Sequence, residues 1–510
     1  MSKLNIIDHT ISYFSPVAGL KRAQARNVQA QLNTISTAYD GAAHSKKTLW
    51  NWLTGSGDSD SDDLPSLPKL RDRSIDLYQN APLAKGAINS KRYNIIGSGL
   101  RYQSSINEKI LGISGEAARD LEKKMEFEFN LWGDSIFSDY EDKSNFREQT
   151  VKVFMGAEIF GDIFVLTPKI KRETTPYTLS IKLVEANACT NPTGANSRTL
   201  SGVENTERGS PKNYYFKKSS AKYSSDTVKI PAFSPLGRRN VIHYFESTRP
   251  NQRRGIPSLS ASITLLKTIK EYTDYEATAA LISSAFTVFI EKEAGQTVGG
   301  TGTNPLLQAQ EDAAPLDMEG MQLEPGMIAE LPPGTKISTA NPGRPNTAFD
   351  SFVQAMFTQL AVANDIPKSI LIKEFSASYS AIRGELGEFW KYIHAKRIHI
   401  VDGFCDPILE LLIDEAVSLG RLNLPGYTDD IAKKKAYLGA VWKGPTRAQI
   451  NPLAEVRAAN EACNGALSNR DLESYKLNES DFDTNVAKGK RENELMLDAG
   501  FIKKEEEDVI

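Results

Sequence analysis

Residues 344–390 read RPNTAFDSFVQAMFTQLAVANDIPKSILIKEFSASYSAIRGELGEFW, and they divide into two helical segments with a polar loop between them. In the first segment the large apolar residues recur with the i, i+3, i+4, i+7 spacing of one buried helix face. They are Phe349, Phe352, Val353, Met356, Phe357 and Leu360. Pro367 cannot continue a helix, so we expect this helix to span residues 346–365. The same rhythm resumes at about Ile382 and predicts a further helical segment over residues 382–429.

The loop between these helices, residues 366–381, is rich in serine and lacks the residue types of a catalytic site. Its candidate functional residues are Lys368, Lys373, Ser376, Ser378, Tyr379 and Ser380. With Glu374 the loop carries little net charge, so it could touch a DNA backbone without holding it tightly. Judged from the residues alone, an ordinary surface turn between two core helices explains the same pattern.

A second long helix is predicted over residues 257–285, where an apolar stripe runs along one side. The residues of this stripe are Leu265, Ile269 and Tyr272. Between the two long helices, residues 286–345 contain a Gly/Thr-rich insertion and short strand-like pieces. These pieces are residues 286–291, 327–331 and 335–339. The order of helix, β-containing insert and helix predicts an insert that protrudes on a helical stalk.

The N-terminal half predicts an α+β fold over residues 70–256, in which helices and short strands are segregated. The predicted strands are rich in β-branched and aromatic residues. They are Ile159–Thr167, Thr178–Val184 and Val241–Phe245. Residues 1–69 read as a weakly helical arm followed by an acidic Gly/Ser/Asp linker without regular structure, and residues 430–510 as shorter helices with an acidic tail.

The composition of the 510 residues is that of a protein with sizeable cores, with 40% hydrophobic and 25% charged residues. Its formal net charge is −3, whereas proteins that grip nucleic acid through phosphates usually carry a basic excess. Contact with DNA would therefore be weak and sliding. The cysteines Cys189, Cys405 and Cys463 are odd in number and lack a C-x-x-C spacing, which favours free thiols in a reducing cytoplasm.

No motif for catalysis, a cofactor or a metal ion is found in the sequence. A phosphate-binding G-x-x-x-x-G-K-[ST] is missing, as are H-E-x-x-H and G-x-S-x-G. His394 and His399 lie five residues apart, so they diverge around a helix and do not converge on one metal. No apolar run approaches about 18 residues, so we expect no membrane span. These absences favour a structural or conduit role over an enzyme.

Several short motifs follow one another along residues 70–500. In the N-terminal half they are Leu70-Arg71-Asp72-Arg73-Ser74-x-Asp76-Leu77-x-x-Asn80, Asn94-Ile95-Ile96-Gly97-x-Gly99-Leu100, Val241-Ile242-His243-x-Phe245 and Arg249-Pro250-x-Gln252-x-Arg254-Gly255-Ile256-Pro257. In the C-terminal half they are Leu323-x-Pro325-Gly326-x-Ile328, Arg344-Pro345-Asn346, Phe375-Ser376-x-x-Tyr379-Ser380-x-x-Arg383, Trp442-x-Gly444-Pro445 and Asn451-Pro452. In this order the motifs resemble those of the lambda-type portal proteins of tailed bacteriophages.

This resemblance implies a ring, typically of twelve copies, at one vertex of the capsid, assembled in the bacterial host cytoplasm and retained in the virion. It implies a wing (70–256, returning over 382–429), stem helices (257–285 and 346–365), a clip (286–345), a tunnel loop (366–381) and a crown (430–510). Implied partners are further copies of the chain, the terminase large subunit, a major capsid or scaffold protein, the head-completion or tail connector protein, and double-stranded DNA. No role is implied for residues 1–69.

Two other classes of function remain open. A DNA-processing enzyme with an unrecognised active site would cleave DNA in the presence of a divalent metal ion. A head-associated adaptor would remain monomeric in solution.

Overall fold

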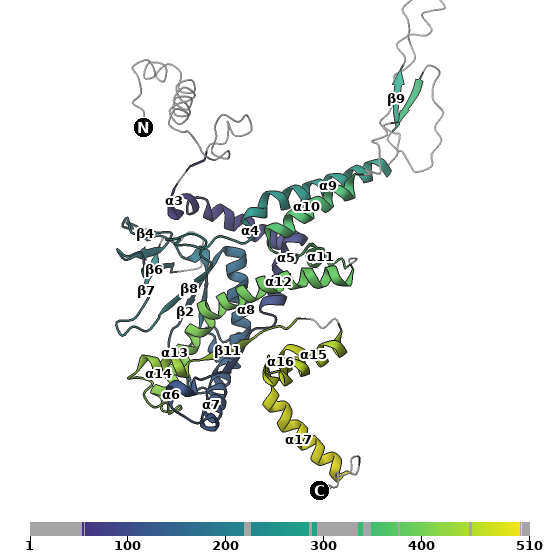
Figure 1. Ribbon diagram of the computed structural model, residues 1–510. Coiled ribbons are helices and arrows are strands. Elements are labelled where there is room, and N and C mark those ends of the chain that lie inside the picture. Colours follow the sequence, from purple (N-terminus) through teal and green to yellow (C-terminus); the bar gives the residue numbers. More distant parts are fainter. Residues whose placement is uncertain are drawn as a thin grey trace, which may run out of the picture. The chain divides into compact units, whose positions relative to one another are not determined.

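The computed structural model describes residues 54–55, 57–218, 226–284, 288–292, 335–339, 348–375, 378–447, 451–499 and 501. The chain divides into two compact units, residues 1–62 and residues 63–510. The helices, labelled in Figure 1, are α3 (Ser59–Asp63), α4 (Leu67–Asn80), α5 (Pro82–Ile95), α6 (Glu108–Leu111), α7 (Gly115–Gly133), α8 (Phe146–Phe160), α9 (Ile263–Ser284), α10 (Phe349–Ala363), α11 (Lys368–Ile372), α12 (Tyr379–Ile400), α13 (Asp406–Ser418), α14 (Ile431–Tyr437), α15 (Pro452–Asn464), α16 (Arg470–Asn478) and α17 (Phe482–Asp498).

The strands are short and form small, separate antiparallel sheets. They are β1 (Arg101–Ser104), β2 (Asp162–Leu166), β3 (Lys182–Glu185), β4 (Thr199–Leu200), β5 (Val203–Asn205), β6 (Pro211–Lys217), β7 (Thr227–Pro231), β8 (Val241–Phe245), β9 (Val288–Lys292), β10 (Thr335–Thr339) and β11 (Ala440–Lys443). The sheet orders are β3-β2-β8, β4-β5-β6-β7, β1-β11 and β10-β9. The predicted α+β class is confirmed.

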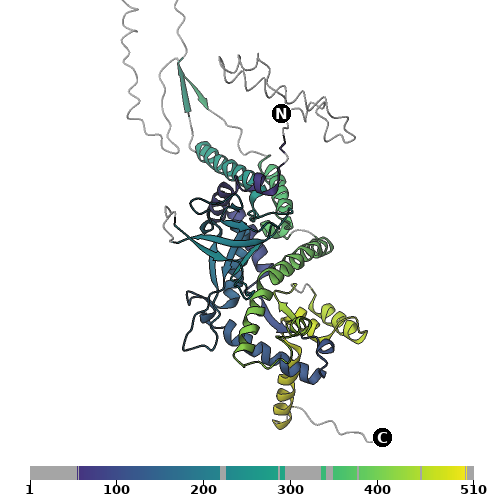
Figure 2. The same ribbon diagram turned by 90° about the vertical axis from the view of Figure 1, so that its left-hand side faces the viewer.

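Two apolar cores hold the larger unit together. The main core lies among α5, α7, α8, α12 and α13, where the ring of Phe129 packs within 6 Å of those of Trp132, Phe146 and Trp442. A smaller core joins the three-stranded and four-stranded sheets, which Figure 2 shows from the side. At its centre Phe164 of β2 lies edge-on to Phe216 of β6, with their ring centroids 5.1 Å apart.

Helix α8 illustrates how local sequence sets an element's start. The Asn145 side chain accepts a hydrogen bond from the Glu148 N–H, and the Glu148 carboxylate accepts one from the Asn145 N–H. This capping box satisfies two amide groups that would otherwise lack partners. At its other end α8 stops at Phe160, so the predicted strand Ile159–Thr167 is shorter, and β2 begins at Asp162.

The predicted stem helices are both shorter in the structure. The first begins at Ile263 instead of Pro257, because a 3-10 turn at Ser260–Ser262 precedes it. The second covers Phe349–Ala363. Helices α9 and α10 contact each other, and Figure 1 shows them side by side; we call this pair of helices the stem. Between them, β9 pairs with β10, while the predicted strand at 327–331 and the Gly/Thr-rich insertion lie outside the described residues.

Three further predictions need correction. The acidic run was expected to be unstructured, but it contains α3, whose first turn is capped when the Asp58 carboxylate accepts from the Ser61 N–H at 2.9 Å. The predicted strand at residues 178–184 is reduced to β3, which starts at Lys182. Residues 430–510 are not only helical, because β11 pairs with β1 of the N-terminal half. Strand pairing over such a sequence distance leaves no local signal.

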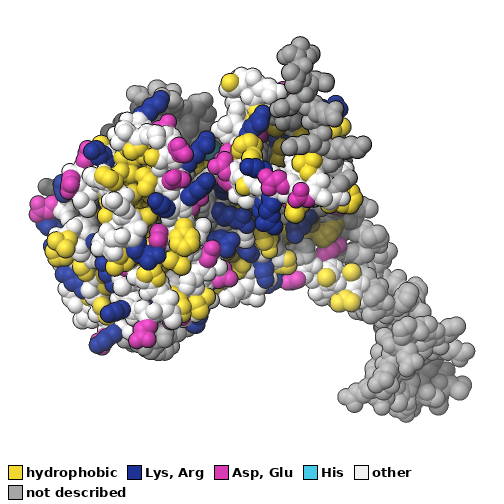
Figure 3. Space-filling view, turned by 90° about the horizontal axis from the view of Figure 1, so that it is seen from below, with side chains coloured by type: hydrophobic (Ala, Val, Ile, Leu, Met, Phe, Trp, Pro, Cys, Tyr) yellow, Lys and Arg dark blue, Asp and Glu magenta, His cyan; other side chains and the backbone are white. Residues whose placement is uncertain are grey.

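The surface is chemically mixed. Figure 3 shows hydrophobic, acidic and basic side chains interspersed over one face, with basic side chains gathered in a central hollow. No helix among the described residues is both long and apolar enough to cross a membrane.

Candidate functional site

The segment between α10 and α12 is the site that the sequence singled out, and its first anchor is Asn364. The Asn364 amide donates to the Leu360 carbonyl at 2.9 Å and to the Ser262 hydroxyl at 3.0 Å. Ser262 lies immediately before α9, so one buried side chain ties the end of one stem helix to the start of the other. Ile366 follows and is buried in the main core.

The second anchor is α11, a short helix that the sequence reading treated as loop. Pro367 precedes it, and Leu371 is buried among core residues. The Ser369 hydroxyl donates to the Glu385 carboxylate of α12 at 2.5 Å. Between α11 and α12 lies the stretch from Lys373 to Ser378, which we call the tip, and of its residues the structure describes Lys373, Glu374, Phe375 and Ser378.

Among the predicted loop residues that the structure describes, Lys373 and Ser378 belong to the tip. Lys373 is exposed and ends α11 in the left-handed conformation, with φ 57°. Ser378 is the N-cap of α12, where its hydroxyl accepts from the Ala381 N–H at 3.4 Å. Ser380 is exposed on the first turn of α12, whereas Lys368 is half-buried at the start of α11. Ser376 and the side chain of Tyr379 lie outside the described part of the chain.

The predicted stem residues form the contact between α9 and α10, and some of them pack against the main core. Tyr272 stacks on Phe349 at 5.6 Å and lies edge-on to Phe352 at 4.9 Å. The buried members are Ile269, Val353 and Leu360, and the half-buried members are Leu265, Met356 and Phe357. Phe352 was expected to be buried with this helix face, but 45% of its surface is exposed.

At the base of the stem, Asp162 binds several partners at once. Its carboxylate accepts from Arg71 at 2.8 Å, from Arg254 at 2.5 and 3.2 Å, and from the Gly255 N–H at 3.2 Å, and it lies 3.1 Å from His243 Nε2. All four side chains are almost fully buried. We call Asp162, Arg71, Arg254 and His243 the stem-base hub.

The hub determines the charge states of its members. Burial alone would raise the pKa of Asp162, but Arg254, His243 and Arg71 outweigh it and hold that pKa well below the usual range. Burial lowers the pKa of His243 below its ordinary value of 6.5, although Asp162 opposes this shift. The hub therefore contains a carboxylate between two guanidinium groups, with a neutral imidazole beside it.

Next to the hub, the backbone at Gly161 and the backbone at Gly255 lie in close contact. Gly161 has a φ of 91°, and a Cβ on either Gly161 or Gly255 would collide with the backbone of the other. The side chain of Gln252 fixes the loop by accepting from the Thr248 N–H and donating to the Arg254 carbonyl. Gln252, Arg254 and Gly255 belong to the sequence motif Arg249–Pro257, and these contacts hold part of the chain that leads to α9.

Within the described ranges, no group of three or more His, Cys, Asp or Glu side chains is arranged to hold a metal ion. His394 is exposed, and His399 Nε2 lies 3.2 Å from the Phe245 carbonyl, so these histidines do not converge.

Sequence reasoning missed Phe375 and the outer surface of the stem. Phe375 is 62% exposed at the tip, and its signal was an aromatic residue between Glu374 and Ser376 within one of the quoted motifs. On the stem, Tyr275 and Val362 are 72% and 75% exposed. In the sequence, both are apolar residues that do not belong to the predicted apolar faces of the two helices.

The structure combines two contacting helices, α9 and α10, with a mixed α/β body. Residues 45–397 match the family model described as phage portal protein, lambda family. The chain belongs to this family of phage portal proteins, and the resemblance read from the motifs is confirmed.

Individual relatives are distant but cover most of the chain. The chain is 22% identical to the portal protein of Escherichia phage N15 and to portal protein B of Escherichia phage lambda, over 452 residues and 84% of each chain. A solved structure of the neck of a native gene transfer agent particle aligns with a TM-score of 0.42 and 10% identity, covering 81% of this chain and 94% of that one.

Proposed function

We propose that the chain assembles into a closed ring of twelve copies at one capsid vertex and forms the channel through which DNA is packaged and later ejected. The observation that carries this proposal is family membership, since the family model spans most of the chain. In this function the protein breaks no covalent bonds and needs no cofactor.

Exposed apolar side chains on the stem support ring assembly. Tyr275 on α9 and Phe352 and Val362 on α10 leave large apolar surface in water in the single chain. Contact with a neighbouring copy would remove this surface from water, at about 25 cal/mol per Å². Heterologous contacts that close on themselves generate rings.

The tip Lys373–Ser378 is our candidate for the channel lining. Lys373, Glu374 and Phe375 are exposed, while Leu371 packs α11 into the core and the Ser369–Glu385 hydrogen bond joins α12 to α11. One cation and one carboxylate leave the tip without net charge. Such a lining would let a polyanion slide, because few phosphates would be neutralised.

The partners of the ring follow from its position in the particle. We propose that terminase drives DNA through the channel, that a capsid or scaffold protein surrounds the ring, and that the head-completion or tail connector protein docks after packaging. Assembly would take place in the host cytoplasm, and the ring would remain in the virion.

Mass measurement in solution combined with negative-stain imaging tests the proposal. We expect ring particles of twelve subunits for the wild type and only monomers for Tyr275→Asp, with an unchanged melting temperature because Tyr275 is exposed. Tyr93→Asp on α5 is the matched control, since Tyr93 is also an exposed tyrosine. Wild-type monomers under all assembly conditions would instead support an adaptor, and metal-dependent DNA cleavage would support an enzyme.

A further inference from the structure

The Trp442-x-Gly444-Pro445 motif marks the place where the chain leaves the body. Trp442 is buried among aromatic rings, and its indole N–H donates to the Asp406 carboxylate at 2.7 Å. A Cβ on Gly444 would lie 2.7 Å from the Leu100 side chain, so a larger residue there would have to displace Leu100. Arg397 donates to the Pro445 carbonyl at 2.8 Å. The chain is thus held firmly up to Pro445.

Beyond this exit, α15, α16 and α17 form a module, residues 452–499, with almost no apolar core. Among the described residues of the module only Ala459 is buried. Apolar side chains such as Leu453, Leu467 and Val486 are exposed. Apolar burial therefore contributes little to holding the module on the body.

Lys443, between Trp442 and Gly444 of the motif, links the module to the body through ion pairs. Its ammonium group lies 3.4 Å from Asp471 of α16 and 3.9 Å from Asp481 at the N-cap of α17. It also lies 5.2 Å from the ring centre of Tyr475. Only 12% of the Lys443 side chain is exposed. A single enclosed cation from β11 thus serves two carboxylates of the module.

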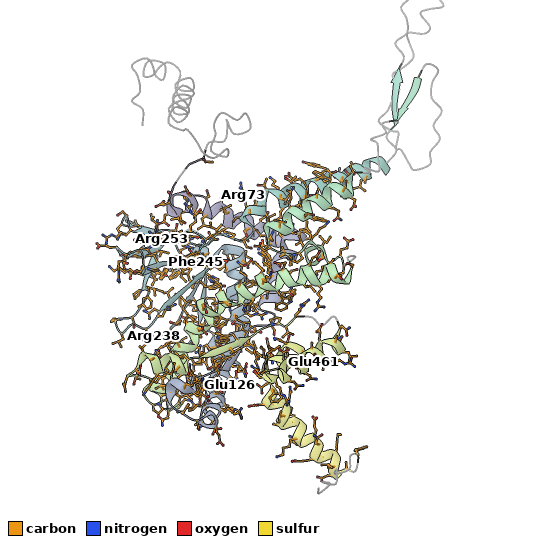
Figure 4. The ribbon with its side chains drawn as sticks, viewed as in Figure 1. Arg73, Glu126, Arg238, Phe245, Arg253 and Glu461 are labelled. Atoms are coloured by element: carbon orange, nitrogen blue, oxygen red, sulfur yellow. The ribbon has the colours of Figure 1, made fainter. Side chains whose placement is uncertain are left out.

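Other carboxylates oppose this contact. Glu122 and Glu126 of α7 line a cleft of about 490 Å³ together with Lys443 and Asp481, and Figure 4 labels Glu126. Burial raises the pKa of both glutamates, and Asp483 and Asp481 raise it further. The other charged residues along the cleft are Arg101, Arg119, Lys123, Glu479 and Asp483. The joint is therefore a balance of attraction and repulsion between charges.

We propose that the module 452–499 is reversibly docked, with Lys443 as the ionic latch that holds Asp471 and Asp481 against the body. Opening the latch frees the module to pivot about the exit at Pro445, while the body stays folded. This inference concerns motion within one subunit and does not depend on ring assembly.

A distance measurement between spin labels tests the latch. One label is placed on the native Cys463 of α15 and the other on Lys124→Cys of α7, an exposed position outside the cleft. Labelled chain is mixed with excess unlabelled chain, so that distances within one subunit dominate. Raising salt from about 0.01 M to about 1 M shortens the Debye length from about 30 Å to about 3 Å.

We expect one narrow distance at low salt and its loss at high salt in the wild type. Lys443→Met should lose the narrow distance at both salt concentrations, and Glu126→Gln should keep it to higher salt. Lys435→Met, which removes a lysine of α14 that pairs with Glu410, should behave as wild type. A wild-type distance in Lys443→Met at every salt concentration would overturn the proposal.

A second variant guards against a folding defect in Lys443→Met. Asp471→Asn combined with Asp481→Asn removes both carboxylates from the module side, and asparagine can still cap α17. This variant should also lose the narrow distance without a change in the main melting transition. If it keeps the wild-type distance, ionic latching is excluded.

Discussion

Replacing Asp162 by asparagine is expected to destabilise the chain more than any surface substitution. The change keeps the size of the side chain but removes the negative charge between Arg71 and Arg254. Both guanidinium groups are buried and could not move into water without opening the base of the stem. Two buried cations would then lack a counter-charge.

The size of the effect follows from the burial of the hub. Removing one partner of a buried ion pair costs about 3–5 kcal/mol, because the remaining charge stays desolvated. Folded domains have a total stability of about 5–15 kcal/mol, so this loss is a large share. At roughly 2–4 °C per kcal/mol, the melting temperature should fall by about 6–20 °C.

Thermal melting of the purified subunit measures this effect, with Asp142→Asn as the matched control. Asp142 pairs with Arg172 at 2.6 Å, but its side chain is about half exposed, so its loss should cost at most about 1 kcal/mol. The reasoning would be refuted if Asp162→Asn melted within about 2 °C of the control. Urea unfolding should show the same order of stabilities.

Three further outcomes are expected. The wild type should lose stability as the pH falls from about 7.5 to about 5.5. The pKa of His243 is lowered in the folded chain, so the unfolded chain takes up a proton more readily. Melting curves of His243→Gln should show a smaller loss of stability over the same pH range. Glu374→Lys with Ser380→Arg, which spares the Ser378 cap, should leave rings intact but slow DNA packaging, with relief at high salt. Unchanged packaging at every salt concentration would remove the tip and the first turn of α12 from the channel. Val353→Asp should prevent folding of the subunit, because it places an unpaired charge in the stem contact, and a folded variant in circular dichroism would contradict that packing.

The helices of the stem could be predicted because their signal is local. Apolar spacing in α10 and the break at Pro367 are properties of adjacent residues. The start of α9 was placed too early because residues 257–262 carry no strong helix-breaking signal after Pro257. Helix α11 was missed because its single turn is held by the burial of Leu371, which depends on the tertiary fold.

The hub could not be predicted from the sequence, although Arg71, His243 and Arg254 lie within motifs that were singled out. Arg71, Asp162 and Arg254 are far apart in the chain, and charged residues are normally expected at the surface. Their convergence depends on β2, α4 and the loop before α9 meeting at one point. The motifs thus indicated that these positions matter without indicating what they touch.

The hub and the Lys443 latch are both built from ion pairs, but they differ in how far their charges are buried. In the hub the charges are almost fully buried, and the surrounding low dielectric makes their loss costly and keeps salt away. At the latch Asp471 and Asp481 are partly exposed, so ions in solution compete for Lys443. Salt should therefore separate the two joints: high salt should release the module 452–499 while the stem remains fixed to the body. A portal subunit built in this way would keep its channel geometry constant while one end of the chain adjusts to its surroundings.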